Sequence, residues 1–428
     1  MIPSLAAAVT GIDANQTMLD VIGNNIANVD TTGFQAGSVQ FADLLNQQIA
    51  GATAPGPTTG GTNPVSVGSG THVVANDTSF AQGTLQQTGQ PTDVAIQGQG
   101  FFVGQQGIGT GALSYTRDGN FSINANGDLV TNTGAYVQGW QATNGVVNPN
   151  GPTQAVVIPQ GQAAPPNQTQ NLNLSGNIPA NPGGTTLPPA ITFSTTAYDS
   201  LGNSVPISVT FTPSSTANNW TMQASANVNG TPTSLFATAP TVTFTSAGQL
   251  KTVTPSTTSA SGATVATTTV SPFPNGKNVN FDFPAVGSPS SVTQFAGNQS
   301  IIVASQDGYT GGTLQKFSVG SNGTVTGTYS NGQTQTIGQL ALANFANLQG
   351  LSKIGNGAYQ STVASGPAQI GVPGTAGRGT LVGGALEGSN VDLGTELTNL
   401  IVAQNAYQAN TKVVTTSNMV LQALENMP

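Results

Sequence analysis

Apolar residues recur at a spacing of seven near both ends of the chain. In residues 4–27 the stripe consists of Leu5, Val9, Ile12, Leu19, Ile22 and Ile26. In residues 391–424 it consists of Leu393, Leu397, Leu400, Tyr407, Val414, Leu421 and Leu424. A narrow apolar seam with this spacing is typical of helices that pair as coiled coils, whereas a core helix shows a wider face. The pattern predicts one helix at each end of the chain.

The residues that flank the two stripes suggest where these helices end. Residues 31–33 read Thr-Thr-Gly, a plausible stop for the first helix. Ser389 or Asn390 is expected to cap the start of the second helix, because short polar side chains accept hydrogen bonds from the free N–H groups there. Asp392 and Glu396 follow in the early turns, where the helix dipole favours anions.

The chain between the two stripes has the pattern of β structure. Short runs of Val, Ile, Thr, Phe and Tyr lie near the turn dipeptide Asn-Gly, which begins at Asn126, Asn144, Asn229, Asn275, Asn322 and Asn331. Many short strands separated by such turns indicate sandwiches or barrels. Residues 50–70, rich in Gly, Pro and Thr, are expected to form a linker, and the Pro-rich residues 143–190 a second joint.

The composition excludes several classes of protein. Only 5% of the residues are charged, against about 25% in an ordinary soluble domain. The net charge is −8 and the first basic residue is Arg117, which argues against a nucleic-acid binder. There is no Cys and one His (His72), so a disulfide framework, thiol catalysis and clustered zinc ligands are excluded. We expect no cofactor, no metal site and no enzyme activity, since no carboxylate pair lies in a catalytic motif. Arg117 is expected to stabilise the local turn beside Asp118.

Two solitary helices at opposite ends of the chain need partners. Each has one narrow apolar seam, and long helices without a packing face are marginal in water. The simplest solution packs them against each other and completes their burial with copies from neighbouring subunits. The sequence therefore predicts a self-assembling protein, whose contacts depend little on salt because there is little charge to screen.

Several motifs resemble one bacterial family. The residues Asn24, Asn25, Ile26, Ala27, Asn28, Gly33 and Phe34 are similar to the N-terminal signature of the flagellar rod and hook proteins, and Ser389, Asn390, Val391, Asp392, Gln404 and Tyr407 to their closing motif. Residues 93–102 and 115–121 resemble the first β domain of that family. Residues 143–297 resemble the insert of hook members, which the shorter rod members lack.

The resemblance implies an α+β, multidomain fold, with paired N- and C-terminal coiled-coil-like helices and two inserted all-β domains. The expected domains are 1–70 with 388–428 (helices and linker), 71–142 with 298–387 (inner β domain) and 143–297 (outer β domain). The implied function is that of a structural hook subunit. It would assemble into a curved, flexible tube that transmits torque from rod to filament and encloses an export channel.

The resemblance also implies partners and a location. The partners are other copies of the chain, the rod, the hook–filament junction proteins, the hook cap and the flagellar export apparatus, with no nucleic acid and no membrane insertion. The chain would lie in the extracellular hook of the flagellum, exported without a cleaved Sec signal, and the apolar start of the sequence indeed lacks a basic segment.

Some features depart from the family pattern and keep alternatives open. Gln35 and Asn405 stand where the family usually has basic residues. A distal rod protein of the same family is the first alternative, and an extracellular adhesin or glycan-binding module is a distant one. The stripes could also belong to ordinary core helices of one globular domain. The glycine-rich residues 98–104 lack the helix and the Lys-Ser/Thr ending of a phosphate-binding loop and are read as a tight β corner.

Overall fold

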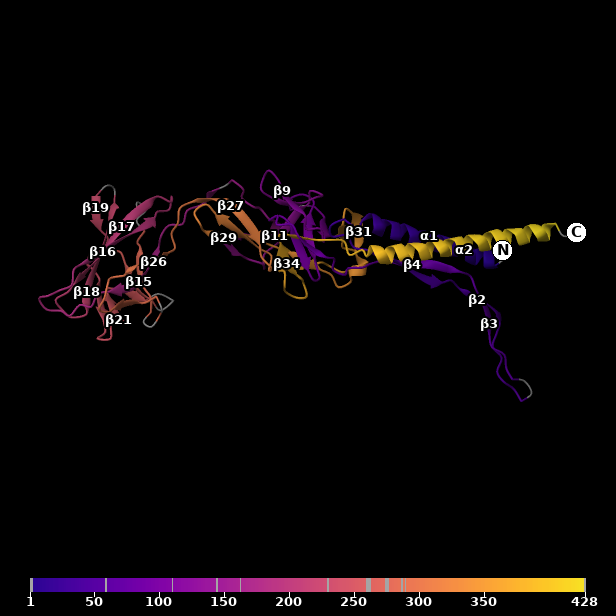
Figure 1. Ribbon diagram of the computed structural model, residues 1–428, viewed down its shortest axis with the longest axis horizontal. Coiled ribbons are helices and arrows are strands. Elements are labelled where there is room, and N and C mark those ends of the chain that lie inside the picture. The colour runs from indigo at the N-terminus through magenta and orange to yellow at the C-terminus, as the bar shows by residue number, and fades with distance from the viewer. Residues whose placement is uncertain are drawn as a thin grey trace. The chain divides into compact units, whose positions relative to one another are not determined.

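The computed structural model describes residues 3–57, 60–109, 111–143, 145–161, 163–228, 231–258, 263–273, 277–285, 288 and 290–426. The chain forms two compact units (Figure 1). The first comprises residues 1–159, 316–327 and 334–428, and the second comprises residues 160–315 and 328–333. Each unit is described by itself below.

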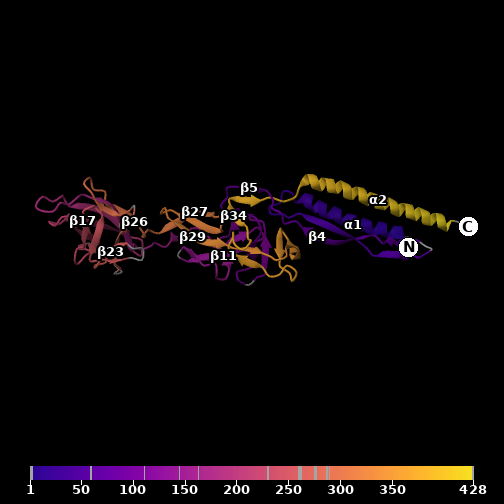
Figure 2. The same cartoon turned by 90° about the horizontal axis from the view of Figure 1, so that it is seen from below.

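The first unit contains the two long helices, α1 (Pro3–Ala27) and α2 (Leu393–Glu425), and a 3₁₀ turn, η1 (Leu348–Gly350). Figures 1 and 2 show α1 and α2 side by side. No described helix has the length and hydropathy needed to cross a membrane.

The cap of α2 differs from the sequence-based expectation. The Asp392 carboxylate accepts hydrogen bonds from the backbone N–H of Gly394 (2.9 Å) and from the hydroxyl of Thr395 (2.9 Å), so Asp392 is the N-cap. The Ser389 hydroxyl instead accepts a bond from the N–H of Val391, which lies two residues before the helix begins. The expectation that Ser389 or Asn390 caps the helix was wrong because the Asn390 side chain is engaged elsewhere.

A long antiparallel ribbon follows α1. Its strands are β1 (Gly37–Asp43) paired with β4 (Thr71–Thr78), and β2 (Asn46–Ala50) paired with β3 (Val65–Gly68). Residues 50–70 were expected to be a linker, and this was wrong for Ala50 and residues 65–68, which lie in strands. Gln47 pairs with Val67 and Thr53 bridges Thr62, because backbone pairing across the ribbon outweighs the local preference of Gly and Pro for turns.

The remaining strands of the first unit form its inner β region. They are β5 (Leu85–Gln87), β6 (Val94–Gln97), β7 (Phe101–Gln105), β8 (Leu113–Thr116), β9 (Phe121–Ile123), β10 (Leu129–Thr131), β11 (Tyr136–Thr143), β12 (Val146–Val147), β13 (Gln154–Ala155), β29 (Thr334–Leu340), β30 (Leu342–Asn344), β31 (Ser352–Gly355), β32 (Ala358–Gln360), β33 (Gln369–Gly371), β34 (Thr380–Gly383) and β35 (Ala385–Glu387). The order along its main sheet is β29-β11-β7-β8-β32-β31. Phe101, Tyr115, Phe345 and Tyr359 pack edge to face in its core.

Two further strands, β27 (Gly312–Val319) and β28 (Thr324–Tyr329), belong partly to each unit, and β14 (Ala163–Ala164) pairs with β27. The second unit holds two six-stranded sheets around a core that includes Trp220, Phe211 and Phe281. Their strands are β15 (Asn171–Ile178), β22 (Thr257–Thr258), β23 (Thr264–Thr267), β24 (Asn280–Phe283), β25 (Val292–Gln294) and β26 (Ile302–Gln306) in one, and β16 (Ile191–Tyr198), β17 (Ser204–Pro213), β18 (Asn219–Val228), β19 (Thr231–Ser234), β20 (Thr241–Phe244) and β21 (Leu250–Thr254) in the other.

Two terminal helices with many sheets between them make this an α+β fold of more than one unit. Three Asn-Gly turns, at Asn126, Asn322 and Asn331, each join two strands that are neighbours in a sheet. The turns at Asn144, at 229–230 and at 275–276 include residues outside the described ranges. The three-domain division stays a prediction, as does coiled-coil geometry for the helices.

Candidate functional site

The two helices approach each other closely at Gly11, and small residues on both helices are buried. Ala8 and Ala14 of α1 and Ala403 of α2 are buried. A Cβ atom added to Gly11 would lie 2.7 Å from the Nδ2 of Asn410, so the helices approach closely at this point. The absence of bulky side chains on this face lets the two backbones come together.

The stripe residues predicted from the sequence lie only partly in this contact. In α1, Ile22 is buried, Leu5, Ile12, Leu19 and Ile26 are half-buried and Val9 is 44% exposed. In α2, Leu400, Tyr407 and Val414 are half-buried, whereas Leu393, Leu397 and Leu421 are 43%, 45% and 37% exposed. The side chain of Leu424 lies outside the described part. Their role in assembly remains a prediction.

The outer surface of α2 carries further apolar side chains that the spacing of seven did not select. They are Ile401, Val402, Val413, Met419 and Val420, each more than 40% exposed in the isolated chain. A count of all apolar positions on the helix would have found them, because they lie on more than one face and so do not form a single stripe with a spacing of seven. Together with Leu393, Leu397 and Leu421 they are termed the α2 apolar surface.

Asn25 links the end of α1 to the ribbon and to α2. Its Oδ1 accepts a hydrogen bond from the N–H of Gly37 (2.9 Å), and its Nδ2 donates to the carbonyl of the same residue (2.8 Å). The Nδ2 also donates to the Oε1 of Glu396 at 3.1 Å. A buried side chain with this many partners explains why the signature around residues 24–28 needs an amide here.

Asn390 joins the start of the α2 segment to two other stretches of chain. Its Oδ1 accepts from the N–H of Ala36 (2.8 Å), and its Nδ2 donates to the carbonyls of Ser79 (2.8 Å) and Ala81 (2.9 Å). Its own N–H donates to the carbonyl of Phe34. The residues Asn25, Gly33, Arg117, Glu387 and Asn390 are termed the junction network, because they connect the helices to the inner β region.

Arg117 and Glu387 form a buried ion pair in this network. The Arg117 Nη1 donates to the Glu387 Oε1 at 3.0 Å, and its Nη2 donates to the carbonyl of Gly98 at 2.7 Å. Glu387 also accepts a bond from the N–H of Gly83, and its carbonyl accepts from Gly33. Arg117 was expected to stabilise only the turn beside Asp118, and this was wrong. The guanidinium extends away from the turn and bonds two distant segments, which no local pattern revealed.

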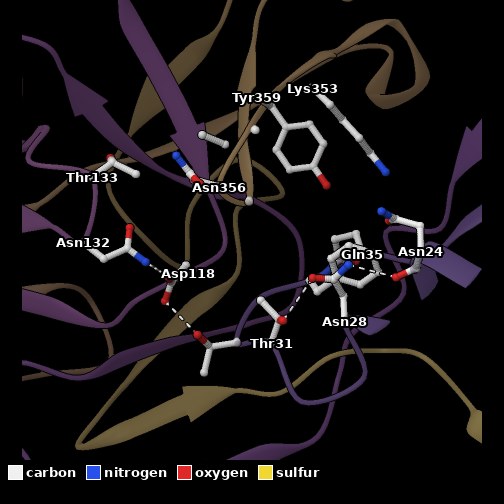
Figure 3. A pocket seen from close by; sticks show the side chains of 15 residues that line it. Asn24, Asn28, Thr31, Gln35, Asp118, Asn132, Thr133, Lys353, Asn356 and Tyr359 are labelled. Atoms are coloured by element: carbon white, nitrogen blue, oxygen red, sulfur yellow. Dashed lines mark hydrogen bonds between the residues drawn. The ribbon is translucent and has the colours of Figure 1, made fainter. Parts of the chain in front are cut away.

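A cleft of about 730 Å³ lies beside the junction network (Figure 3). Asn24 of α1 and Asn28, which directly follows the helix, line it together with Asp118, Lys353 and Asn356 of the inner β region. Burial raises the pKa of Asp118 above its ordinary value, although hydrogen bonds from Asn120, Thr32 and Asn132 oppose the shift.

Lys353 is the cation of this cleft. Its Nζ lies 5.9 Å from the centroid of the Phe34 ring, and burial lowers the pKa of its ammonium. Within the described ranges Lys353 makes no ion pair. Burial likewise raises the pKa of Tyr359, on the same wall, to about 12.

The other residues of the two signatures take structural positions. Ala27 ends α1, Gly33 has a positive φ of 66°, and Gln404 is exposed on α2. Val391 precedes the Asp392 cap. Across the described ranges, no group of three or more His, Asp or Glu side chains is placed to hold a metal ion.

Comparisons with known proteins cover both ends and the middle of the chain. Residues 5–35 match the family described as flagella basal body rod protein, and residues 382–427 match the flagellar basal body rod FlgEFG protein C-terminal family. Residues 95–180 match the flagellar hook protein FlgE/F/G D1 domain, and residues 179–309 match the flagellar basal body protein FlaE D2 domain.

Complete relatives resemble the chain along nearly its whole length. The flagellar hook protein FlgE of Treponema pallidum is 36% identical, over 99% of this chain and 99% of that protein. The flagellar hook protein FlgE of Escherichia coli K12 is 35% identical, over 99% of this chain and 100% of that protein. The flagellar basal-body rod protein FlgG of Bacillus subtilis is 28% identical, over 100% and 99%.

A crystal structure of the Helicobacter pylori flagellar hook protein FlgE2 shares the fold, with a TM-score of 0.51 and 16% identity. The match covers 69% of this chain and 98% of the Helicobacter pylori chain. The signatures that build the junction network, the insert matched at 179–309 and the full-length identity of 35–36% agree. The chain belongs to the flagellar hook protein family.

Proposed function

We propose that this chain is the structural subunit of a flagellar hook, and that copies of it assemble into a curved, flexible tube. The tube joins the rod to the filament, transmits torque and encloses an export channel. The observation that carries the proposal is the α2 apolar surface, eight apolar side chains each 37–60% exposed on one helix of the isolated chain. This much exposed apolar side chain on one helix is typical of a surface that is covered on association.

The helix pair supplies the assembly surface and the junction network supplies its stiffness. Torque carried from one subunit to the next must pass between the helices and the β region of each chain. The buried bonds of Asn25, Asn390 and Arg117 hold that junction, and each would have to break for the helices to swing freely. A rigid junction beside an apolar assembly surface fits a mechanical coupling element.

The axial partners follow from this role. We propose that the two ends of the tube meet the rod and the hook–filament junction proteins, and that a hook cap and the flagellar export apparatus handle the subunit before assembly. The chain would lie in the extracellular part of the flagellum after export without a cleaved Sec signal. No enzymatic step is part of the proposal, in keeping with the flagellar hook proteins that the chain resembles.

A rod protein of the same family is the second candidate. The similarity to the Bacillus subtilis rod protein over the whole chain favours it, although at lower identity than the hook relatives. The two candidates differ in the form of the polymer, since a rod is straight and rigid and a hook is curved.

Electron microscopy of the concentrated protein tests the proposal. The full chain is compared with a version that lacks residues 1–30 and 395–428, which removes most of both helices. Curved tubes from the full chain, and none from the truncated one, are expected. Straight rigid tubes would favour the rod candidate, and dispersed monomers in both samples would contradict assembly through the helices.

A further inference from the structure

The turn at Asn356 and Gly357 differs from the other Asn-Gly turns of the chain. Within the described ranges, both residues of an Asn-Gly pair are present at Asn126, Asn150, Asn322, Asn331 and Asn356. In the first four, the glycine N–H donates to the carbonyl three residues earlier, at 3.0, 3.3, 2.9 and 2.9 Å. In that same set, Gly357 alone has an N–H without an acceptor.

The Asn356 side chain is also without a hydrogen bond to any described residue, whereas both polar atoms of the Asn331 side chain are bonded. The turn joins β31 to β32, where Gly355 pairs with Ala358. Asn356 and Gly357 have φ angles of 52° and 68°, and two residues with positive φ are the mark of a tight hairpin turn.

The space beside the Gly357 Cα is open, while the Gly357 carbonyl accepts a hydrogen bond from the Thr116 hydroxyl at 3.0 Å. A Cβ added to Gly357 would meet only the Thr116 Oγ1, at 4.0 Å. A Cβ at Gly127 would lie 2.6 Å from the Ile158 carbonyl, and one at Gly323 would lie 2.8 Å from Pro373. Gly357 is therefore less crowded than these two turns and resembles Gly332, where a Cβ would meet nothing within 4 Å. The Gly357 N–H, free among the described residues, is what sets this turn apart from the one at Gly332.

We infer that, among the five Asn-Gly pairs within the described ranges, Asn356 is the preferred site of spontaneous deamidation in the folded protein. The Gly357 nitrogen loses its proton and attacks Cγ of Asn356, a new N–C bond forms, and ammonia leaves with that proton. Water then opens the succinimide ring and leaves aspartate or isoaspartate. A glycine N–H that is bonded to a carbonyl must first break that hydrogen bond before its nitrogen can attack. Asparagine is among the residues that are chemically least stable.

The product changes the cleft beside the junction network. Asn356 and Lys353 line the same cleft, and the reaction places a new carboxylate there. Lys353 makes no ion pair within the described ranges, so the modified chain gains a counter-charge near an unpaired ammonium. The inference does not depend on the proposed function.

Mass spectrometry of peptides from the full chain tests the inference after incubation in mildly alkaline buffer. Because a bond to a glycine N–H contributes about 1 kcal/mol, Asn356 is expected to gain one dalton roughly fivefold faster than the other four sites. Equal rates at all five sites, or a faster rate at any of the four, would overturn the inference.

Two controls show that the fold sets the rate. In concentrated urea the five rates are expected to converge, because every glycine N–H is then exposed to solvent; a preference for Asn356 that persists in urea would contradict a structural origin. The variant Asn356→Gln should remove the early mass change from this peptide and leave the other four unchanged. An undiminished early change in its peptide would show that another residue is modified.

Discussion

The Arg117 guanidinium and the Glu387 carboxylate meet at 3.0 Å across 270 residues of chain, with side chains 2% and 0% exposed. The pair ties the strand before the α2 segment to the turn after β8. Breaking a buried pair by removing one partner leaves an uncompensated charge, which costs far more than the net worth of the pair.

Removal of the arginine alone should therefore weaken the first unit. Arg117→Met is expected to lower the free energy of unfolding by about 3–5 kcal/mol. The double variant Arg117→Met with Glu387→Leu should recover much of that loss, because no unpaired charge remains. Urea unfolding followed by Trp140 fluorescence, in a Trp220→Phe background, measures both; a double variant no more stable than the single one would contradict this account of the pair.

The turn at Gly33 offers a test of the junction with a matched control. A Cβ on Gly33 would lie 2.6 Å from the Asp118 backbone nitrogen, whereas one on Gly134 meets nothing within 4 Å; their φ angles are 66° and 79°. An alanine at either position must adopt a left-handed backbone, which costs about 1–2 kcal/mol. Only Gly33→Ala also brings its Cβ atom into overlap with the Asp118 backbone. The same unfolding measurement should find Gly33→Ala clearly the less stable, and equal losses would count against a tightly packed junction.

The α2 apolar surface can be tested by charge. Leu397 is 45% exposed on α2, and Leu201 is 80% exposed in the second unit. Leu397→Lys is expected to reduce the sedimentable polymer strongly, because a lysine ammonium cannot be buried against a neighbouring copy without a partner. Leu201→Lys serves as the control and should sediment like the unchanged chain. Equal sedimentation of both variants would show that α2 is not an assembly surface.

Asp199 makes the second unit sensitive to acid. Burial alone would raise its pKa, but hydrogen bonds from Asn203, Leu201 and Gly202 outweigh burial and hold the pKa below its ordinary value. A carboxylate with a lowered native pKa stabilises the fold above its unfolded pKa of about 3.9 and loses that contribution as the pH falls through the native value.

The variant Asp199→Asn isolates this contribution. Its free energy of unfolding is compared with that of the unchanged chain by Trp220 fluorescence, with both proteins in a Trp140→Phe background. The stability difference between the two proteins should be constant near neutral pH and shrink below about pH 4. A difference that grows in acid would mean that the hydrogen bonds do not favour the ionised form.

Salt should have little effect on the assembled polymer. The chain carries 5% charged residues, and the ion pair between Arg117 and Glu387 is shielded from solvent. Screening acts chiefly on exposed charges, so the sedimentable fraction is expected to stay nearly constant from low to high ionic strength. A sharp rise or fall would show that surface charges control assembly.

The two helices could be predicted from the sequence because their information is local. The spacing of seven placed them at residues 4–27 and 391–424, close to the observed Pro3–Ala27 and Leu393–Glu425. The contact face could not be predicted in the same way. Gly11 has no apolar side chain that could mark a stripe, yet the helices approach closely at this position.

Features that depend on distant residues were the ones that the pattern missed. Residues 50–70 were read as a linker, although Ala50 and residues 65–68 pair in the ribbon, because Gly and Pro set the local preference while the partner strand decides the outcome. The junction network joins Asn25 to Glu396 and Arg117 to Glu387, and no spacing in the sequence indicates which of the few charged groups will meet. The signature residues were identified only by resemblance, and the structure supplies their physical roles.

Cryo-electron microscopy of tubes assembled from the full chain tests the central claim most directly. The account predicts that α1 and α2 form the innermost layer around an open channel, with the α2 apolar surface covered by neighbouring copies and the β structure outside. Sheet density nearest the axis, or an α2 apolar surface left exposed to solvent in the tube, would contradict it.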